Sequence, residues 1–304
     1  MSVGLDRVAI LLATYNGRTY IEEQVNSICW QTHPQWHLFV RDDGSKDGTV
    51  EFVRTLVPGQ NLTIIDPASD VGGSPSRNFF AILRAVNLNE FDYVAFCDQD
   101  DIWAPRKLAH AIECIRKSGA GGYSCNMIPF DNGSQNAWFL NKSFPEQNLD
   151  YLFQGASAGC TYVLNRTCAE LLQRNIKRIC DDPPTGFSHD WTIYALCRSF
   201  GQKWHHDKEA HIFYRQHGLN SFGALPSYKG LLARLRLARS GWYRNNILWL
   251  GDLLHGHEEE RAVLERVRRF SLADRWWLAR HCYSFRRRRR DAIFIGIIAL
   301  CGLI

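Results

Sequence analysis

The sequence predicts an α/β protein built on a mostly parallel β-sheet, and three observations lead to this fold class. Within residues 1–130, short apolar runs alternate with longer amphipathic runs four times. Each apolar run is followed by a polar segment rich in Asp, Asn and Gly. The composition, with 45% hydrophobic and 22% charged residues, suits a chain with a sizeable buried core. Regular alternation of strand and helix is the pattern of a parallel, doubly wound sheet.

The apolar runs predict strands, and the runs between them predict helices. The strands are expected at residues 8–12, 38–40, 62–65 and 93–97. Apolar residues recur at helical spacing between them. The helices are expected at residues 21–30, from a cap at Asp47 to residue 56, at 74–86, and from Pro105 onward. Farther along, residues 204–214 are expected to form a strand, and a capped helix is expected to start at 188–190.

Four polar segments follow the first four strands. They are A-T-Y-N-G at 13–17, R-D-D-G-S-K-D-G-T at 41–49, D-V-G-G-S-P-S-R-N at 70–78 and D-Q-D-D at 98–101. In an open α/β sheet, ligands bind outside the carboxyl ends of the strands. We therefore expect these segments to converge on one ligand-binding edge, called the rim below.

The cysteines and the N-terminus bear on the compartment. None of the ten cysteines forms a C-x-x-C pair, and several lie inside apolar runs, where a thiol behaves as a small core residue. This spacing predicts a reducing, cytosolic compartment, with neither a disulfide framework nor a zinc site. Residues 1–7 contain no basic segment that leads into an apolar one, so no signal peptide is expected.

The acidic block at the end of the fourth strand is expected to bind a positively charged partner. Asp98, Asp100 and Asp101 lie within four positions, directly after an apolar run. Burying even one such carboxylate costs several kcal/mol unless something pairs with it. Mg²⁺ and Mn²⁺ prefer oxygen ligands and are often shared between carboxylates and substrate phosphates. A solvated turn with helix-capping acids is the alternative for this motif taken alone.

The chain lacks the glycine motifs that most nucleotide-binding folds carry. It has neither G-x-x-x-x-G-K-[ST] nor G-x-G-x-x-G after the first strand, which argues against a P-loop enzyme and a nicotinamide-dependent oxidoreductase. A nucleotide would need other contacts. Asp42 or Asp43 can accept from a pyrimidine N–H, Tyr15 can line or stack on the base, and Arg77 can pair with phosphate. An Asx-capped turn is the alternative for Asp42 and Asp43.

Taken together, the motifs resemble those of the family-2 glycosyltransferases, which share the GT-A fold. The resemblance rests on A-T-Y-N-G, D-D-G-S-K-D-G-T, D-Q-D-D-I-W and a later H-D-W, and it covers about residues 7–222. The D-Q-D-D-I-W form, with R-Q-H-G-L-N downstream, is most similar to the bacterial rhamnosyltransferase-like branch that builds polysaccharide.

The resemblance assigns roles to particular residues. It implies that Asp98 and Asp100 form the D-x-D motif, with Asp100 as the direct metal ligand, and that His217 contacts the metal or the diphosphate. It also implies that Asp190 of H-D-W is the catalytic base; a helix cap is the alternative for this residue. The resemblance further implies that Ala13, Thr14 and Tyr15, with Asp42 and Asp43, bind the base and the ribose. One departure is Asp70, where relatives carry Asn.

The implied reaction is an inverting, metal-dependent sugar transfer from a nucleotide diphosphate donor to a glycan or lipid-linked acceptor, in cell-surface polysaccharide synthesis. The resemblance favours L-rhamnose from dTDP-rhamnose. Transfer from a UDP-hexose or UDP-N-acetylhexosamine is the alternative within the fold. A nucleotidylyltransferase is disfavoured because the G-x-G-T-R-like loop is missing after the first strand. A non-catalytic sugar-nucleotide-binding partner is the rival from another class.

The last 80 residues differ in charge from the rest of the chain. Residues 225–304 carry 16 Lys and Arg against 7 Asp and Glu, whereas residues 1–224 carry 20 against 24. Residues 231–250 are expected to be helical, five arginines occupy 286–290, and the apolar run 292–304 is too short to span a bilayer. These features fit helices on an anionic membrane surface. The alternatives are a nucleic-acid-binding tail, which the acidic remainder disfavours, and a basic hairpin packed on the catalytic domain.

We therefore expect a catalytic domain at residues 1–224, with a nucleotide-sugar half at 1–130 and an acceptor half at 131–224. Residues 225–304 are expected to form a helical extension. The protein is expected in the cytoplasm, peripheral on the inner face of the cell membrane. The oligomeric state stays open.

Overall fold

The computed structural model describes residues 6–66, 73–131, 136–217 and 227–304. The chain forms two compact units that interleave along the sequence. Unit 1 comprises Met1–Ser143, Ser157–Ile176 and Gln202–Asn220, and unit 2 comprises Phe144–Ala156, Lys177–Gly201 and Ser221–Ile304.

Unit 1 contains one eight-stranded sheet with the strand order β3-β2-β1-β4-β7-β6-β8-β5. The four strands predicted from the N-terminal apolar runs are present and mutually parallel. They are β1 (Val8–Thr14), β2 (Trp36–Asp42), β3 (Leu62–Ile65) and β4 (Tyr93–Cys97). The prediction of a mostly parallel α/β sheet is therefore confirmed.

The other half of the sheet mixes strand directions. It consists of β5 (Ile102–Trp103), β6 (Gly122–Asp131), β7 (Val163–Asn165) and β8 (Trp204–Gln216). Strand β7 runs antiparallel to both β4 and β6, whereas β6 and β8 are parallel. Because β6 and β8 thus run in the same direction as β1, the carboxyl end of β8 reaches the same edge of the sheet as that of β4.

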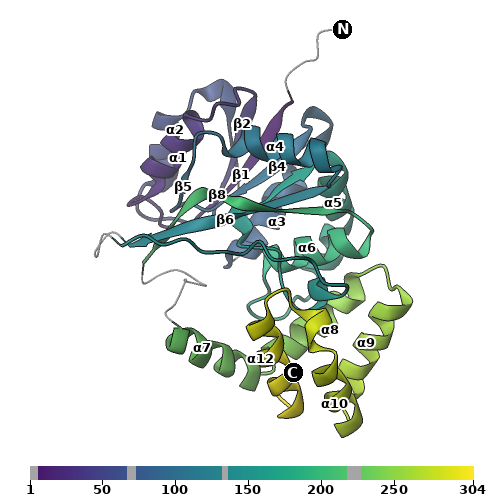
Figure 1. The fold of residues 1–304 in the computed structure, drawn as a ribbon. Coiled ribbons are helices and arrows are strands. Elements are labelled where there is room, and N and C mark those ends of the chain that lie inside the picture. Colours follow the sequence, from purple (N-terminus) through teal and green to yellow (C-terminus); the bar gives the residue numbers. More distant parts are fainter. Residues whose placement is uncertain (1–5, 67–72, 132–135, 218–226) are drawn as a thin grey trace. The chain divides into compact units, whose positions relative to one another are not determined.

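Helices cover both faces of the sheet in unit 1 (Figure 1). On one face, α1 (Ile21–Cys29), α2 (Thr49–Leu56) and α4 (Lys107–Ser118) pack over a core that includes Val8, Ile10 and Leu12. The other face is covered by α3 (Pro75–Ala85), and the first part of α5 (Arg166–Cys180) lies beside α3, where Gln173 donates to the Leu83 carbonyl. Residues 8–12 are completely buried, because both faces of β1 are covered. This explains why the first strand is a continuous apolar run instead of an alternating one.

Two helices begin later than the sequence predicts. Helix α2 starts at Thr49, and Gly48 precedes it with φ 77°; Asp47 still caps the first turn, because its Oδ1 accepts from the Thr49 N–H at 3.1 Å. Helix α4 starts at Lys107 and not at Pro105. The chain before it is held extended, because β5 pairs with β8 and the Ala104 N–H donates to the His211 carbonyl at 2.9 Å.

Unit 2 is helical. The segment predicted as one helix at 231–250 is two helices, because Gly241 takes φ 75° between them. The helices of this unit are α6 (His189–Ser199), α7 (Ser227–Arg239), α8 (Trp242–Leu253), α9 (Glu258–Arg269), α10 (Leu272–Arg280), α11 (Cys282–Phe285) and α12 (Arg289–Leu300). Short 3-10 turns occur in the two units at Gly59–Asn61, Leu88–Glu90, Asp150–Leu152 and Gly159–Thr161.

A buried carboxylate organises unit 2. Asp150 is fully buried and accepts from the Tyr194 hydroxyl at 3.1 Å. It also forms ion pairs with Arg198 at 3.5 Å and Arg287 at 3.3 Å. Burial raises the pKa of Asp150, and the two guanidinium groups oppose that rise. Arg287, one of the five consecutive arginines, therefore serves the interior of this unit.

Helix α12 buries one face and exposes the other. Ala292, Ile295, Ile298 and Ala299 are buried, whereas Ile293, Ile297 and Leu300 are each about half exposed (49%, 53% and 52%). The three exposed residues follow the i, i+4, i+7 spacing of one helix face. Among the described residues, every helix falls short of the length or the apolarity needed to cross a membrane.

Candidate functional site

The carboxyl ends of β1 and β2 meet in a hydrogen-bonded pair. Thr14 lies opposite Asp42, and its hydroxyl donates to Asp42 Oδ1 at 2.8 Å. The same carboxylate accepts from the backbone N–H groups of Gly44 and Ser45 at 3.0 and 2.6 Å, and from the Ser45 hydroxyl at 2.5 Å. Asp42 therefore forms the Asx-capped turn that the sequence left as an alternative.

The other predicted base-binding residues occupy distinct environments at the same end. Asp43 is buried, and one of its oxygens lies 3.8 Å from the Arg41 guanidinium. Ala13 is the penultimate residue of β1, directly before Thr14, and is partly exposed. Tyr15 is 58% exposed, so its ring is available to a ligand.

A glutamine connects the first rim segment to the acidic block. The Tyr15 N–H donates to Gln99 Oε1 at 2.8 Å, and Gln99 Nε2 donates to the Tyr15 carbonyl at 3.0 Å. A Cβ atom at Gly17 would lie 2.3 Å from Gln99 Oε1, so a side chain at position 17 would displace this contact. Sequence reasoning missed Gln99, although an amide between acids, which both donates and accepts, was the available signal.

The segments D-Q-D-D and R-Q-H come together at the ends of β4 and β8. Asp100 Oδ2 lies 2.7 Å from His217 Nε2, and both side chains are 16% exposed. Arg215 is buried; its Nε donates to the Asp100 carbonyl at 2.9 Å, and its backbone N–H donates to Asp101 Oδ1 at 3.1 Å. The His217 ring stacks on the Tyr20 ring, with 5.1 Å between the ring centroids. The structure thus brings two predicted residues, Asp100 and His217, into direct contact.

The acidic block contains an unsatisfied oxygen. Asp101 is completely buried, and its Oδ2 has no hydrogen-bond partner among the described residues. Burial raises the pKa of Asp101 well above its ordinary value, and the nearby charges of Asp100 and Asp98 raise it further. Ligand atoms of Asp98, Asp101 and Cys160 lie within 4.8 Å of one another. The carboxylate oxygens of this block are of the type that a hard divalent cation binds.

A buried lysine lies beside this block. Lys107 is fully buried, and its Nζ lies 3.5 Å from the centre of the Trp103 ring, without a hydrogen bond. Burial lowers the pKa of Lys107 to about 8. Within the described residues its Nζ makes no hydrogen bond to the acids, although the charge of Asp101 partly opposes the fall in the pKa of Lys107.

Arg77 is the predicted phosphate-binding residue of unit 1. Arg77 lies on the exposed side of the first turn of α3, where its N–H donates to the Ser74 hydroxyl at 3.3 Å. Its guanidinium has no hydrogen bond or ion pair with any described residue. Asp70, the departure from the family pattern, lies outside the described residues.

Asp190 belongs to unit 2, in the first turn of α6. Its Oδ1 accepts from the Trp191 N–H at 2.7 Å, and a carboxylate is favourable at a helix N-terminus. The structure therefore contains the capping contact, while the assignment of Asp190 as a base stays a prediction. The neighbouring His189 has a buried Nε2, and burial lowers its pKa to about 3.

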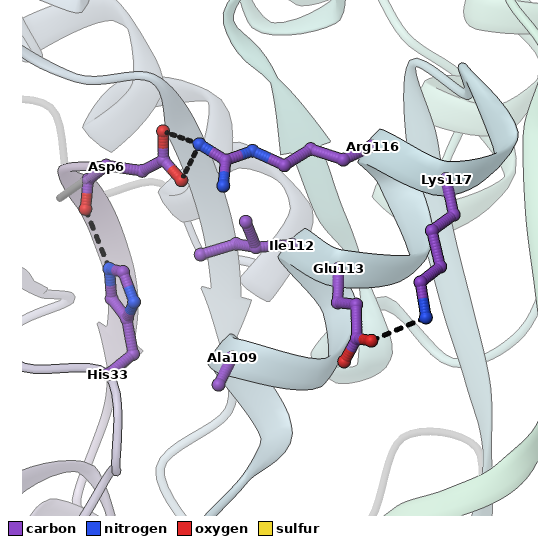
Figure 2. A pocket seen from close by; sticks show the side chains of 7 residues that line it. All are labelled: Asp6, His33, Ala109, Ile112, Glu113, Arg116 and Lys117. Atoms are coloured by element: carbon purple, nitrogen blue, oxygen red, sulfur yellow. Dashed lines mark hydrogen bonds and ion pairs between the residues drawn. The ribbon is translucent and has the colours of Figure 1, made fainter. Parts of the chain in front are cut away.

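The hollow in Figure 2 lies at the opposite edge of the sheet from the rim. It is lined by residues that precede β1 and β2 and by α4, and it is bordered by ion pairs between Asp6 and Arg116 at 2.6 Å and between Glu113 and Lys117 at 2.6 Å. His33 contacts the Asp6 carbonyl at 2.7 Å. None of the predicted site residues lines this hollow.

Comparison with known proteins gives consistent results. The family model described as "Glycosyl transferase family 2" matches residues 9–185. The dTDP-rhamnosyl transferase RfbG of Shigella flexneri is 30% identical over 96% of this chain and 100% of its own length. A putative teichuronic acid biosynthesis glycosyltransferase, TuaG of Bacillus subtilis (strain 168), is 32% identical over 52% of this chain and 61% of its own length.

Solved structures share the fold. S. aureus TarS 1–349 in complex with UDP-GlcNAc aligns with a TM-score of 0.60 and 15% identity, covering 94% of this chain and 83% of that chain. The mannosyltransferase PcManGT from Pyrobaculum calidifontis, in complex with GDP-Man and Mn²⁺, aligns with a TM-score of 0.55 and 17% identity, covering 99% and 75%.

Proposed function

Because the chain belongs to glycosyl transferase family 2, we propose that it moves a sugar from a nucleotide diphosphate donor onto a glycan or lipid-linked acceptor. The donor binds at the rim of unit 1. The observation that carries this proposal is the contact between Asp100 and His217, at 2.7 Å, beside the unsatisfied oxygen of Asp101. An acidic site built this way binds a positive group, and a cation shared with a diphosphate supplies one.

In this proposal Asp98 and Asp100 hold Mg²⁺ or Mn²⁺. The cation, when bound, neutralises the negative charge that develops on the leaving diphosphate. His217 and Arg215 fix the orientation of Asp100, since one contacts its carboxylate and the other its carbonyl. Tyr15 lines the nucleotide base with its exposed ring, while Asp43 accepts from the base or ribose, and the structured Asp42 turn holds their loop in place. Arg77 pairs with phosphate from α3.

Asp190 acts in this proposal as the general base. It removes the proton from the acceptor hydroxyl as that oxygen attacks the anomeric carbon, and the bond from carbon to the diphosphate oxygen breaks. Attack from the face opposite the leaving group inverts the anomeric centre. The contact to the Trp191 N–H orients the Asp190 carboxylate at the start of α6.

The proposed donor is dTDP-rhamnose, and the proposed transferred sugar is L-rhamnose. The similarity to RfbG over nearly the whole chain supports this assignment. A UDP-hexose or UDP-N-acetylhexosamine is the second candidate, because TarS was crystallised with UDP-GlcNAc. The proposed acceptor suits an enzyme on the inner face of the cell membrane. The half-exposed apolar face of α12, together with the basic residues near it, supports membrane association.

The first test is calorimetric titration of the purified protein with dTDP, UDP and GDP, each with Mn²⁺ and with chelator. We expect metal-dependent binding with dTDP as the tightest ligand, and a loss of at least about tenfold in affinity in Asp100→Asn. The matched control is Asp252→Asn, which removes a 75% exposed carboxylate of unit 2 and should leave binding unchanged. Preference for UDP would redirect the donor assignment. Absence of metal-dependent binding to all three nucleotides would contradict the metal site.

The second test separates catalysis from binding. Asp190→Asn should keep nucleotide affinity within error and lower turnover of dTDP-rhamnose by roughly 10²- to 10⁴-fold, the range for removal of a general base. The asparagine keeps an oxygen for the Trp191 N–H, so the helix cap survives. Turnover at the wild-type level in this variant would reduce Asp190 to the capping role.

A further inference from the structure

Unit 1 holds a second cluster of metal-ligating side chains, away from the rim. Helix α4 contributes His110 and Cys114, four residues apart, and β8 contributes Asp207, Glu209 and His211. Ligand atoms of His110, Cys114 and Asp207 all lie within 4.8 Å of one another, as do those of His110, Glu209 and His211.

The separations within this cluster match a tetrahedral metal site. His110 Nε2 lies 2.9 Å from Asp207 Oδ2 and 3.4 Å from Cys114 Sγ. His211 Nε2 lies 3.6 Å from Asp207 Oδ2 and 3.4 Å from Glu209 Oε2. Zinc bonds of about 2.0–2.3 Å place tetrahedral ligand atoms roughly 3.3–3.6 Å apart. The His110–Cys114, His211–Asp207 and His211–Glu209 separations fall in that range, and the His110–Asp207 separation is shorter by a few tenths of an ångström. The His211–Glu209 separation does not involve two of the ligands proposed below, so two of the three separations between proposed ligands match.

His211 points a buried nitrogen into the cluster. The residue is 8% exposed, and its Nε2 makes no hydrogen bond, although two carboxylates lie nearby. A buried polar atom without a partner costs free energy. His211 thus directs its Nε2 toward a space that other potential metal ligands surround.

The surrounding structure orients this cluster. The Tyr123 hydroxyl donates to Asp207 Oδ2 at 2.7 Å, and the Glu209 N–H donates to Asp207 Oδ1 at 3.1 Å, so the carboxylate is held from both sides. Outer partners of this kind position the ligands of metal sites. Strand β8 is also irregular here: Ser124 of β6 pairs with His206, but Asn126 already pairs with Ala210. Such bulges redirect side chains.

We propose that His110, Asp207 and His211, with Cys114 as the fourth ligand, bind a structural zinc ion that joins α4 to β8. Imidazole, thiolate and carboxylate together suit a borderline cation better than Mg²⁺ or Mn²⁺. Glu209, whose side chain is 66% exposed, lies where an ion can enter from solvent. This site differs from the rim site in ligands and in metal, and it does not depend on the donor or on the reaction.

A zinc ion at this position would also stabilise the rim. Helix α4 follows Asp100 along the chain, and β8 leads directly into His217. A clamp between α4 and β8 therefore holds the two elements whose adjoining residues meet at 2.7 Å. Removing the metal should loosen that contact without removing any rim ligand.

The test measures zinc in the purified full-length chain after dialysis against excess Mg²⁺, which occupies the rim acids. We expect one zinc per chain, and a thermal midpoint that falls when zinc is chelated. Substituting Co²⁺ should give a thiolate-to-cobalt charge-transfer band, which Cys114→Ser abolishes while cobalt binding by the remaining ligands persists. His110→Ala and His211→Ala should each lower zinc affinity by more than about tenfold.

Two controls keep the result specific. Cys29→Ser, which changes a partly buried thiol on α1, should keep the charge-transfer band, and Asp100→Asn should keep the zinc. Substoichiometric zinc in the wild type would overturn the proposal, as would zinc retained equally in His110→Ala and His211→Ala. Zinc lost in Asp100→Asn would assign the metal to the rim instead.

Discussion

At Lys107 the fold of unit 1 buries an ammonium group that no hydrogen bond satisfies. Its Nζ faces the Trp103 ring at 3.5 Å, and a cation over an indole face gains about 0.5–2 kcal/mol. Desolvation outweighs this gain, because burial lowers the pKa of Lys107 from 10.5 to about 8. The adjacent Asp101 shifts in the opposite direction, since burial raises its pKa. For each group, burial favours the neutral form, although the charge of Asp101 partly opposes the fall in the pKa of Lys107.

The lowered pKa predicts how stability depends on pH. Between about pH 8 and 10.5 the unfolded chain keeps a proton that folded Lys107 has released. Unfolding then takes up a proton, so the contribution of this lysine to the free energy of unfolding increases as the pH rises through that window. Below pH 8 the folded state bears the full cost of the buried charge. We expect Lys107→Met to raise the free energy of unfolding at pH 7 by on the order of 1–3 kcal/mol.

Urea unfolding of wild type and variant at several pH values checks this prediction. The difference between the two proteins should shrink toward zero between pH 8 and 10.5. Lys117→Met is the matched control, because its ammonium is 75% exposed and pairs with Glu113 on the same helix. A Lys107→Met variant that is less stable than wild type at pH 7 would mean that the charge of Lys107 stabilises the acidic block.

At the scale of elements, the sequence predicts a strand or helix well where all its residues are buried. It predicts an element poorly where that element forms only by pairing with a strand far away in the chain. Residues 62–65 and 93–97 are strands with the predicted limits. All of residues 93–97 are buried, because a continuous apolar run of this kind fits a strand covered on both faces. The two-residue strand β5 was missed, because its pairing of Ile102 with Phe213 depends on residues more than a hundred positions away. The late start of α4 follows from the same pairing.

The candidate site divides in a similar way. The motif resemblance identified Asp100 and His217, and their contact at 2.7 Å joins segments that lie far apart in the chain. Gln99 and the buried Arg215 lie within the motifs D-Q-D-D and R-Q-H, but their supporting contacts with backbone groups emerged only from the fold. The spacing rule for zinc ligands likewise looks for neighbours in sequence, whereas His110 and His211 belong to two different elements.

The run of five arginines shows a further limit of local sequence patterns. As a run of charge it is typical of a solvated or membrane-facing surface, and the exposed Arg289 and Arg290 agree with that interpretation. Arg286 and Arg287 do not, because burial lowers the pKa of Arg286 and Arg287 pairs with the buried Asp150. A buried carboxylate far away in sequence thus recruits part of the run into the interior of unit 2.

At the scale of the whole molecule, charge and apolar exposure concentrate in the same C-terminal residues. Residues 225–304 carry a net charge of +9, whereas residues 1–224 carry −4. Within them, Ile293, Ile297 and Leu300 form the half-exposed face of α12, and Leu272 and Trp276 of α10 are 79% and 58% exposed. A basic region with exposed apolar and aromatic side chains is the combination that binds an anionic membrane surface.

This combination predicts membrane binding with two separable components. The wild type should cosediment with vesicles that contain phosphatidylglycerol, and less so as salt increases, because salt screens the attraction of exposed arginines to anionic lipid. Replacing Ile293, Ile297 and Leu300 together by Ser should weaken binding at every salt concentration. Arg289→Glu with Arg290→Glu should weaken it mainly at low salt, by roughly fivefold or more for each residue at about 1 kcal/mol per charge.

Trp30→Ser is the control for this measurement, since it removes a 73% exposed aromatic side chain from unit 1 and should leave vesicle binding unchanged. The oligomeric state of each protein should also be measured from its mass in solution, because an exposed apolar face can also pair two copies of the chain. A wild type that dimerises without binding vesicles, and a triple Ser variant that is monomeric, would reassign the face of α12 to an interface between subunits. Equal vesicle binding by wild type and the triple variant would remove α12 from the membrane contact altogether.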